Sequence, residues 1–216
     1  MIDWKQIDTV LLDMDGTLLD LNFDNYFWRE HVPRRYAEKK GLALEAAKQE
    51  LFPRFRDAEG TIDWYCVDYW SEQLGLDIAM LKQEVEHLIA VHPHVVEFLD
   101  RMQALGKQRI LVTNAHHKSL MLKLERTALQ RHLDIVICAH DFGIPKENLA
   151  FWDKLKNKQP FDKKRTLLVD DSLPVLRSAH RYGIAGLLAV TRPDSKSPVR
   201  EVDEFQAIYD FSEIMP

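Results

Sequence analysis

The pair of aspartates Asp13 and Asp15 follows a short apolar run at residues 9–12. Two carboxylates at this spacing can divide the work of covalent phosphoryl transfer. One attacks and forms an aspartyl-phosphate, and the other protonates the leaving oxygen and later activates water. Gly16 permits a tight turn directly afterwards. Taken alone, the motif also fits an aspartate-rich turn at the end of a strand.

A second acidic pair, Asp170 and Asp171, follows the apolar run at residues 166–169. Adjacent carboxylates at the end of a strand are costly unless they face a cation. Placed beside Asp13 and Asp15, they would form an oxygen-rich site suited to Mg²⁺. Capping of the helix that follows is the alternative role for this pair.

Four further residues have side chains that can hold a phosphate group. Thr113 and Asn114 end another apolar run, and a hydroxyl, an amide and the backbone N–H groups beyond them can bind phosphate oxygens. Lys146 lies on a loop and could neutralise the nucleophile and the phosphate together. Lys118 opens the helix after Asn114 and could reach a phosphate oxygen. The ordinary alternatives are strand-end capping for the first two residues and a solvated surface charge for each lysine.

These residues need a scaffold, and the apolar runs provide its strands. Continuous Val, Ile and Leu are typical of strands that are covered on both faces, as in a parallel sheet. Helical patterns at 95–105, 119–129 and 173–182 alternate with the runs, which predicts an α/β fold with a doubly wound parallel sheet and a Rossmann-like core. Ligands of such sheets lie beyond the carboxyl ends of the strands, so the polar residues should share one site. The five predicted strands are residues 9–13, 109–114, 133–138, 166–171 and 185–190.

Residues 21–92 interrupt this alternation. They contain no comparable strand, only helical patterns such as 45–52 and 78–89, and they are rich in aromatic residues. We therefore expect a smaller all-helical domain at 21–92, called here the helical insert, within an α/β core made of residues 1–20 and 93–216. The polar segment 191–204 is expected to be a surface loop.

Composition excludes several classes of protein. Lys and Arg number 29 against 34 Asp and Glu, so the net charge is −5, which argues against a general nucleic-acid binder. The basic segment 154–165 is then best interpreted as a solvated helix face and linker. No run approaches the roughly 18–20 apolar residues of a membrane span, and two cysteines cannot form a disulfide framework. We expect a cytoplasmic protein with a small-molecule partner, and the oligomeric state stays open.

Four motifs of this sequence, in their order along the chain, resemble those of the haloacid dehalogenase superfamily, and the resemblance covers essentially the whole sequence. The motifs are Asp13 with Asp15, Thr113 with Asn114, Lys146, and Asp170 with Asp171. The resemblance implies that Asp13 is the nucleophile and Asp15 the general acid and base. It implies that Thr113, with Asn114 beside it, binds the phosphoryl group, and that Lys146 supplies the positive charge.

The same resemblance implies a Mg²⁺ site and a cap. Asp171 would be the metal-binding acid of the last motif, with Asp170 a neighbouring ligand or a partner through water. Asp13 through its carboxylate and Asp15 through its backbone carbonyl would complete the site. The helical insert is similar to the smaller cap of the family, which closes over the substrate and excludes water.

The substrate class follows from finer resemblance. Dehalogenases of the superfamily lack the second aspartate because a halide leaves without a proton, so Asp15 favours phosphate esters. The strings at 18–21, 113–116 and 143–147 look like those of bacterial GMP/IMP 5′-nucleotidases, which implies a phosphomonoesterase of purine 5′-monophosphates. Aromatic residues of the helical insert that could stack on a purine are Trp28, Trp64, Tyr65, Tyr69 and Trp70.

Two alternative functions stay open. One is a phosphatase or mutase acting on a small sugar phosphate or phosphoglycolate. The other is a non-catalytic module that binds a phosphate ligand, although a pure binder has no need of the acid/base Asp15. No cysteine or carboxylate stands at metal-ligand spacing from His116 and His117, so we expect no metal role for these histidines.

Overall fold

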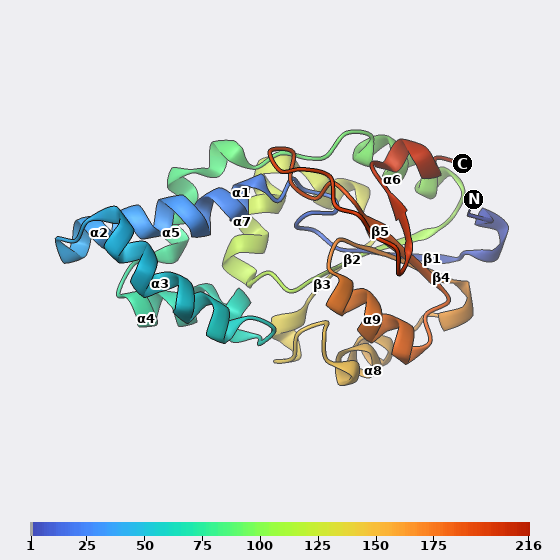
Figure 1. Ribbon diagram of the computed structural model, residues 1–216. Helices are drawn as coiled ribbons and strands as arrows, with labels where there is room; N and C mark the ends of the chain where they lie inside the picture. The colour runs from blue at the N-terminus through green and yellow to red at the C-terminus, as the bar shows by residue number, and fades with distance from the viewer. Residues whose placement is uncertain (1) are drawn as a thin grey trace.

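Six parallel strands form one sheet in the computed structural model, which describes residues 2–216 (Figure 1). Their order is β3-β2-β1-β4-β5-β6, so β1 lies at the centre between β2 and β4. This order is that of a doubly wound sheet whose direction of winding reverses beside β1. The strands are β1 (Thr9–Leu12), β2 (Gln108–Thr113), β3 (Ile135–Cys138), β4 (Thr166–Asp170), β5 (Gly186–Val190) and β6 (Gln206–Ile208).

The predicted α/β class and all five predicted strands are confirmed, with ends shifted by at most two residues. Strand β6, which pairs with β5 at the edge of the sheet, was not predicted from the sequence. This strand has only three residues and begins with an exposed glutamine. It therefore lacks the long apolar run by which the other strands were predicted.

Alternate residues of each strand pack on opposite faces of the sheet. Val10 and Leu12 belong to one buried cluster, whereas Leu11 belongs to the other. Helices α6 and α7 cover the first face and α8 and α9 the second, as Figure 1 shows above and below the sheet. Because both faces are covered, the strands are apolar throughout. The four helices are α6 (Val95–Ala104), α7 (His117–Thr127), α8 (Leu149–Lys158) and α9 (Leu173–Tyr182).

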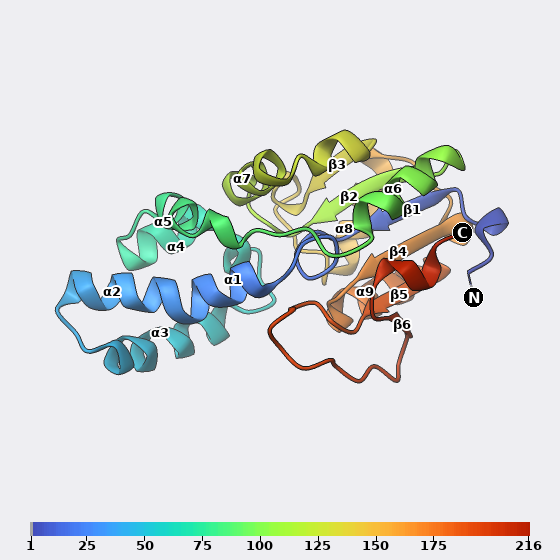
Figure 2. The same ribbon diagram turned by 90° about the horizontal axis from the view of Figure 1, so that it is seen from above.

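The helical insert lies beyond the carboxyl ends of the strands (Figure 2). Its aromatic residues pack on one another, with the rings of Phe55 and Trp70 at 5.0 Å and perpendicular. Such packing gives this helical group an apolar core of its own. Its helices are α1 (Asn22–Tyr26), α2 (Val32–Lys40), α3 (Leu44–Ala58), α4 (Val67–Leu74) and α5 (Ile78–Glu84), with a π-helical turn at Phe27–His31.

The chain enters and leaves the helical insert through two segments that lie side by side. The N–H of Asp20 donates to the carbonyl of Ala90, and the N–H of His92 donates to the carbonyl of Leu18, both at 2.9 Å. Within residues 2–216, the backbone therefore passes between the sheet and these helices at two adjacent crossings. Among residues 2–216, no helix combines the length and the apolar character that crossing a membrane would require.

Candidate active site

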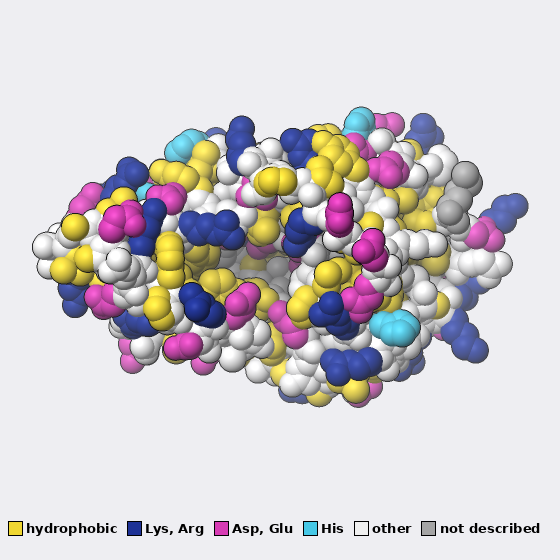
Figure 3. Space-filling model, in the orientation of Figure 1, with side chains coloured by type: hydrophobic (Ala, Val, Ile, Leu, Met, Phe, Trp, Pro, Cys, Tyr) yellow, Lys and Arg dark blue, Asp and Glu magenta, His cyan; other side chains and the backbone are white. Residues whose placement is uncertain are grey.

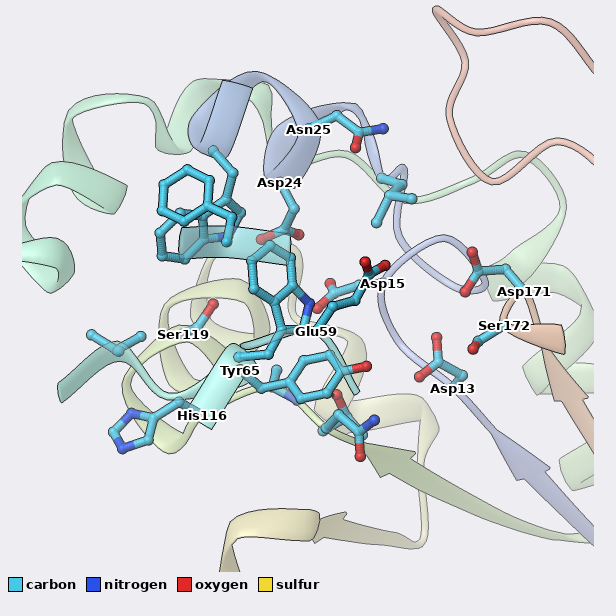
Figure 4. Close-up of a pocket in the computed structure, with 18 of the residues that line it drawn as sticks. Asp13, Asp15, Asp24, Asn25, Glu59, Tyr65, His116, Ser119, Asp171 and Ser172 are labelled. Carbon is cyan, nitrogen blue, oxygen red and sulfur yellow. The ribbon is translucent and has the colours of Figure 1, made fainter. Parts of the chain in front are cut away.

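A cavity of about 790 Å³ lies between the carboxyl edge of the sheet and the helical insert. Figure 3 shows the hollow on the surface, and Figure 4 shows side chains from both sides pointing into it. Parallel strands end at one edge, which brings the polar residues that follow β1, β2 and β4 together. The sequence-predicted residues that line this cavity are Asp13, Asp15, Thr113, Asn114, Lys146, Asp170 and Asp171.

Lys146 stands at the floor of the cavity with its side chain only 2% exposed. Its ammonium donates to Asp13, to Asp170 at 2.7 Å and to the Val112 carbonyl at 3.0 Å. Although burial opposes its charge, the two carboxylates raise the pKa of Lys146 above its ordinary value. A permanently charged lysine is therefore held against Asp13.

Three carboxylates surround a point beside this lysine. One oxygen from each of Asp13, Asp170 and Asp171 lies within 4.8 Å of the others. Burial, followed by repulsion from a neighbouring carboxylate, raises the pKa of Asp13 and Asp171 to about 7 and that of Asp170 to about 6. Oxygen donors that repel one another fit a hard divalent cation, which would offset their charge. The residues present can thus hold a metal ion.

The turn after β1 must come very close to this acidic group. Gly16 has φ +89°, and a Cβ atom there would lie 2.8 Å from the carboxylate carbon of Asp171. Only glycine meets both conditions without displacing the carboxylate. On its other side, Asp171 accepts a hydrogen bond of 3.1 Å from Arg200, in the loop that follows β5.

Removal of divalent cations is expected to make the free energy of unfolding fall as pH rises from about 4 to about 7. Over this range the folded chain retains protons on the three raised carboxyl groups that the unfolded chain, with ordinary pKa values near 3.8, has lost. Fewer protons on the unfolded state mean that stability declines with pH. Urea unfolding with EDTA at about pH 5 and about pH 7 measures the decline.

The control is the same pair of measurements with a saturating divalent cation, which should remove most of the decline. Asp24 does not interfere, because Lys123 and Lys82 overcome the effect of burial and lower its pKa to about 2, below this range. An identical pH dependence with and without the cation would contradict a metal site at these carboxylates.

Asn114 connects the end of β2 to the loop that carries Lys146. Its side-chain oxygen accepts from the N–H of Lys146, and its amide donates to Glu147, both at 2.9 Å. The other oxygen of Glu147 accepts from the hydroxyl of Tyr65 at 2.6 Å. Thr113 is buried, and its hydroxyl accepts from the N–H of Ala115, as strand-end capping requires. Sequence reasoning missed Glu147, which adjoins the predicted lysine.

Asp15 belongs to a second charged group that sequence reasoning also missed. The ammonium of Lys123, from α7, lies 2.7 Å from Asp15 and 2.6 Å from Asp24, and Lys82 lies 2.9 Å from Asp24. Both lysines are buried, and burial raises the pKa of Asp15. One feature of the sequence could have indicated that Lys123 is buried: it stands next to Leu124, which belongs to the apolar face of its helix.

Lys118 is the predicted site residue that does not join the cavity. Its ammonium pairs with Asp68, and its side chain is about half exposed. Lys118 does not line the cavity, whereas Ser119 beside it does. Contact between Lys118 and a phosphate group therefore stays a prediction that this arrangement does not favour.

The aromatic candidates divide in the same way. Trp28, Trp64 and Tyr65 line the cavity. Tyr69 and Trp70 do not line it, and Trp70 is 1% exposed among the other rings of the helical insert. The prediction that Trp70 could stack on a purine is therefore wrong, because neighbouring side chains of the helical insert already bury this ring.

A doubly wound sheet with carboxylates and a buried lysine at its carboxyl edge defines a class of hydrolase. The chain belongs to the haloacid dehalogenase-like hydrolases, whose family model matches residues 7–183. It is 42% identical over 215 residues to GMP/IMP nucleotidase YrfG of Escherichia coli (strain K12), covering 100% of this chain and 97% of that protein.

A more distant curated relative and a solved structure with the same fold are also similar to the chain. The chain is 22% identical to phosphoglycolate phosphatase of Agrobacterium fabrum, covering 95% of this chain and 90% of that one. The crystal structure of a HAD phosphatase from Thermococcus onnurineus superposes with a TM-score of 0.80 at 20% identity, covering 96% of both chains. The family recognised from the sequence motifs is confirmed.

Proposed function

We propose that this hydrolase is a Mg²⁺-dependent phosphomonoesterase that converts purine 5′-monophosphates, GMP and IMP foremost, to nucleoside and phosphate. The observation that carries the chemistry is the Asp13 carboxylate, held by Lys146 and flanked by Asp171 at the floor of an open cavity. The 42% identity to a GMP/IMP nucleotidase over the full chain supports the choice of substrate.

The reaction proceeds in two steps on two aspartates. Asp13 attacks the phosphorus, and the bond from phosphorus to the nucleoside 5′-oxygen breaks as Asp15 protonates that oxygen. Burial raises the pKa of Asp15, which favours the protonated form that this step requires. Asp15 then takes a proton from water, and the water oxygen attacks the phosphorus, so that phosphate leaves and free Asp13 is restored.

Positive charge is needed because an anionic carboxylate must approach an anionic phosphate. Lys146 supplies one such charge to Asp13 directly. Mg²⁺, when held by Asp13, Asp171, the nearby Asp170 and the backbone carbonyl of Asp15, supplies charge neutralisation at the phosphate oxygens. Thr113, at the end of β2, and Asn114, which follows it, both line the cavity and would bind the remaining phosphate oxygens.

The helical insert serves as the cap in this proposal, with residues 21–92 as one domain and 1–20 with 93–216 as the other. Its two adjacent connections to the sheet suit a hinge. Tyr65 on the insert and Glu147 on the sheet side meet across the cavity, so closure can exclude water from the aspartyl-phosphate. We place the reaction in the cytoplasm, where the unpaired Cys66 and Cys138 stay reduced.

The base would lie against the aromatic wall of the cavity. Trp28, Trp64 and Tyr65 supply flat apolar surfaces, and Arg29 and Arg56 supply hydrogen-bond donors at the same wall. The volume of about 790 Å³ falls within the range of roughly 300–1,000 Å³ that small-molecule sites occupy. A nucleoside monophosphate therefore has space for both its base and its phosphate.

Phosphate release from a panel of nucleoside monophosphates and sugar phosphates, with Mg²⁺ present, tests the proposal. We expect GMP and IMP to give the highest kcat/KM, at least about tenfold above pyrimidine nucleotides, which corresponds to about 1.4 kcal/mol. Turnover of sugar phosphates or phosphoglycolate alone would keep the chemistry and overturn the nucleotide assignment. Isomerised product in place of phosphate would identify a mutase, and binding without turnover would identify a binding module.

A further inference from the structure

Three residues far apart in the sequence meet beside the cavity, away from the aspartates. Cys66 precedes α4 in the helical insert, His116 precedes α7, and His140 lies in the turn after β3. The sulfur and one ring nitrogen of each histidine lie within 4.8 Å of one another. In the view of Figure 4, His116 and Asp13 lie on opposite sides of Tyr65.

The donor atoms of this cluster are held by few contacts. The sulfur of Cys66 accepts a long hydrogen bond of 3.4 Å from the N–H of Tyr69. Nε2 of His140 is buried and has no hydrogen-bond partner within residues 2–216. Nδ1 of His116 accepts from the N–H of Lys118 at 3.3 Å, and its Nε2 lies 3.7 Å from a carboxylate oxygen of Asp68, so a bound zinc ion would replace one of these two contacts. Burial, followed by repulsion from the neighbouring His116, lowers the pKa of His140 to about 4. Burial also lowers the pKa of His116 below its ordinary value. Both imidazoles are therefore neutral near pH 7, the form that binds metals.

We infer that Cys66, His116 and His140 form a zinc-binding site. A thiolate and two imidazoles are the ligands that Zn²⁺ prefers, and three protein ligands leave a fourth tetrahedral position for water. The carboxylate cluster at Asp13 offers only oxygen, which suits Mg²⁺. The two sites should therefore select different metals from the same solution.

Zinc bound here would tie the helical insert to the sheet. Cys66 belongs to the insert, whereas His116 and His140 follow β2 and β3. Tyr65, next to Cys66, already contacts Glu147 across the cavity. The ion would thus restrain the position of α4 over the cavity and stabilise the folded chain. Binding of zinc does not depend on the proposed phosphatase activity. Only an effect of zinc on turnover would rest on that proposed function.

Cobalt binding to the full-length protein tests this site, because Co²⁺ takes zinc sites and shows a thiolate-to-metal absorption band. The titration is made with Mg²⁺ in excess, which occupies the carboxylate cluster. We expect the band to develop with one equivalent of Co²⁺ and to disappear when Zn²⁺ is added. Cys66→Ser should abolish the band, and His140→Gln should weaken cobalt affinity by at least about tenfold.

Matched controls use the other cysteine and the neighbouring histidine. Cys138→Ala removes a thiol whose pKa burial raises to about 11 and which donates to the Ala115 carbonyl, so the band should persist. His117→Gln alters an exposed ring that pairs with Asp141, and the band should again persist. No band in the wild-type protein, or a band retained in Cys66→Ser, would overturn the site and leave the histidines as packing residues.

A measurement on the wild-type protein covers the case in which a variant does not fold. Zinc should slow alkylation of Cys66 by iodoacetamide by at least about tenfold, as followed by mass spectrometry of the peptide that contains it. Equal rates with and without zinc would also overturn the inference. Loss of phosphatase activity would not affect this result, so the two proposals fail separately.

Discussion

Asp13→Asn is expected to lower kcat for phosphate release by about 10⁴-fold or more, because an amide cannot attack phosphorus as the carboxylate does. The fold should survive the change. Asparagine has nearly the same shape, and Lys146 keeps its contacts with Asp170 and the Val112 carbonyl. Burial already raises the pKa of Asp13 to about 7, so a neutral group at this position is not costly. Steady-state kinetics and thermal unfolding measure the two effects.

The matched control is Asp100→Asn, prepared in the same way. Asp100 is exposed and pairs with His132, so this variant should retain wild-type kcat. Activity of Asp13→Asn within tenfold of the wild type, in protein whose intact mass shows no wild-type chain, would rule out a covalent intermediate on Asp13.

Lys123→Met is expected to lower the free energy of unfolding by about 3–5 kcal/mol, because it leaves buried carboxylates without their shared cation. Lys123 is 1% exposed and contacts both Asp15 and Asp24. Lys82 remains beside Asp24, but no described lysine or arginine other than Lys123 forms an ion pair with Asp15. Urea unfolding near pH 7 measures the loss.

A role for Lys123 in positioning Asp15 requires a measurement that simple destabilisation would not change. Lys123 lowers the pKa of Asp15 against the effect of burial, so its removal should raise that pKa further. The pH dependence of kcat that arises from Asp15 should therefore move to higher pH. A lower kcat with an unmoved pH profile would assign Lys123 a structural role alone.

Two further variants control for the charge and for the helix. Arg126→Met removes an exposed cation from the same helix and should change the unfolding free energy by no more than about 0.5 kcal/mol. Adding Asp24→Asn to Lys123→Met removes one unpaired charge and should recover part of the lost stability. If Lys123→Met were as stable as Arg126→Met, the buried ion pairs would contribute nothing.

The α/β class and most of the catalytic edge could be predicted from the sequence. Apolar runs such as those ending at Leu12 and Val169 predict buried strands, and parallel strands present their carboxyl ends at one edge. Asp13 and Asp171, which follow two of these strands, are therefore expected at one edge, whereas Lys146 lies on a loop and was expected there from the family resemblance. Strand β6 was missed because three residues at a sheet edge carry no pattern.

Other contacts depend on how separate helices pack, and no spacing along the chain encodes them. Lys82 and Lys123 look like ordinary helix lysines, yet packing of α5 and α7 against α1 buries both beside Asp24. Cys66 and His140 are 74 positions apart and meet only because the helical insert lies over the ends of β2 and β3.

Local periodicity and strand-end residues thus determine the sheet and the reacting carboxylates, since both depend on neighbours in sequence. The tertiary structure alone decides the cavity wall, the charge that accompanies Asp15 and the cysteine–histidine cluster. The physical reason is that burial and electrostatic pairing act through space, between groups that the chain brings together only on folding.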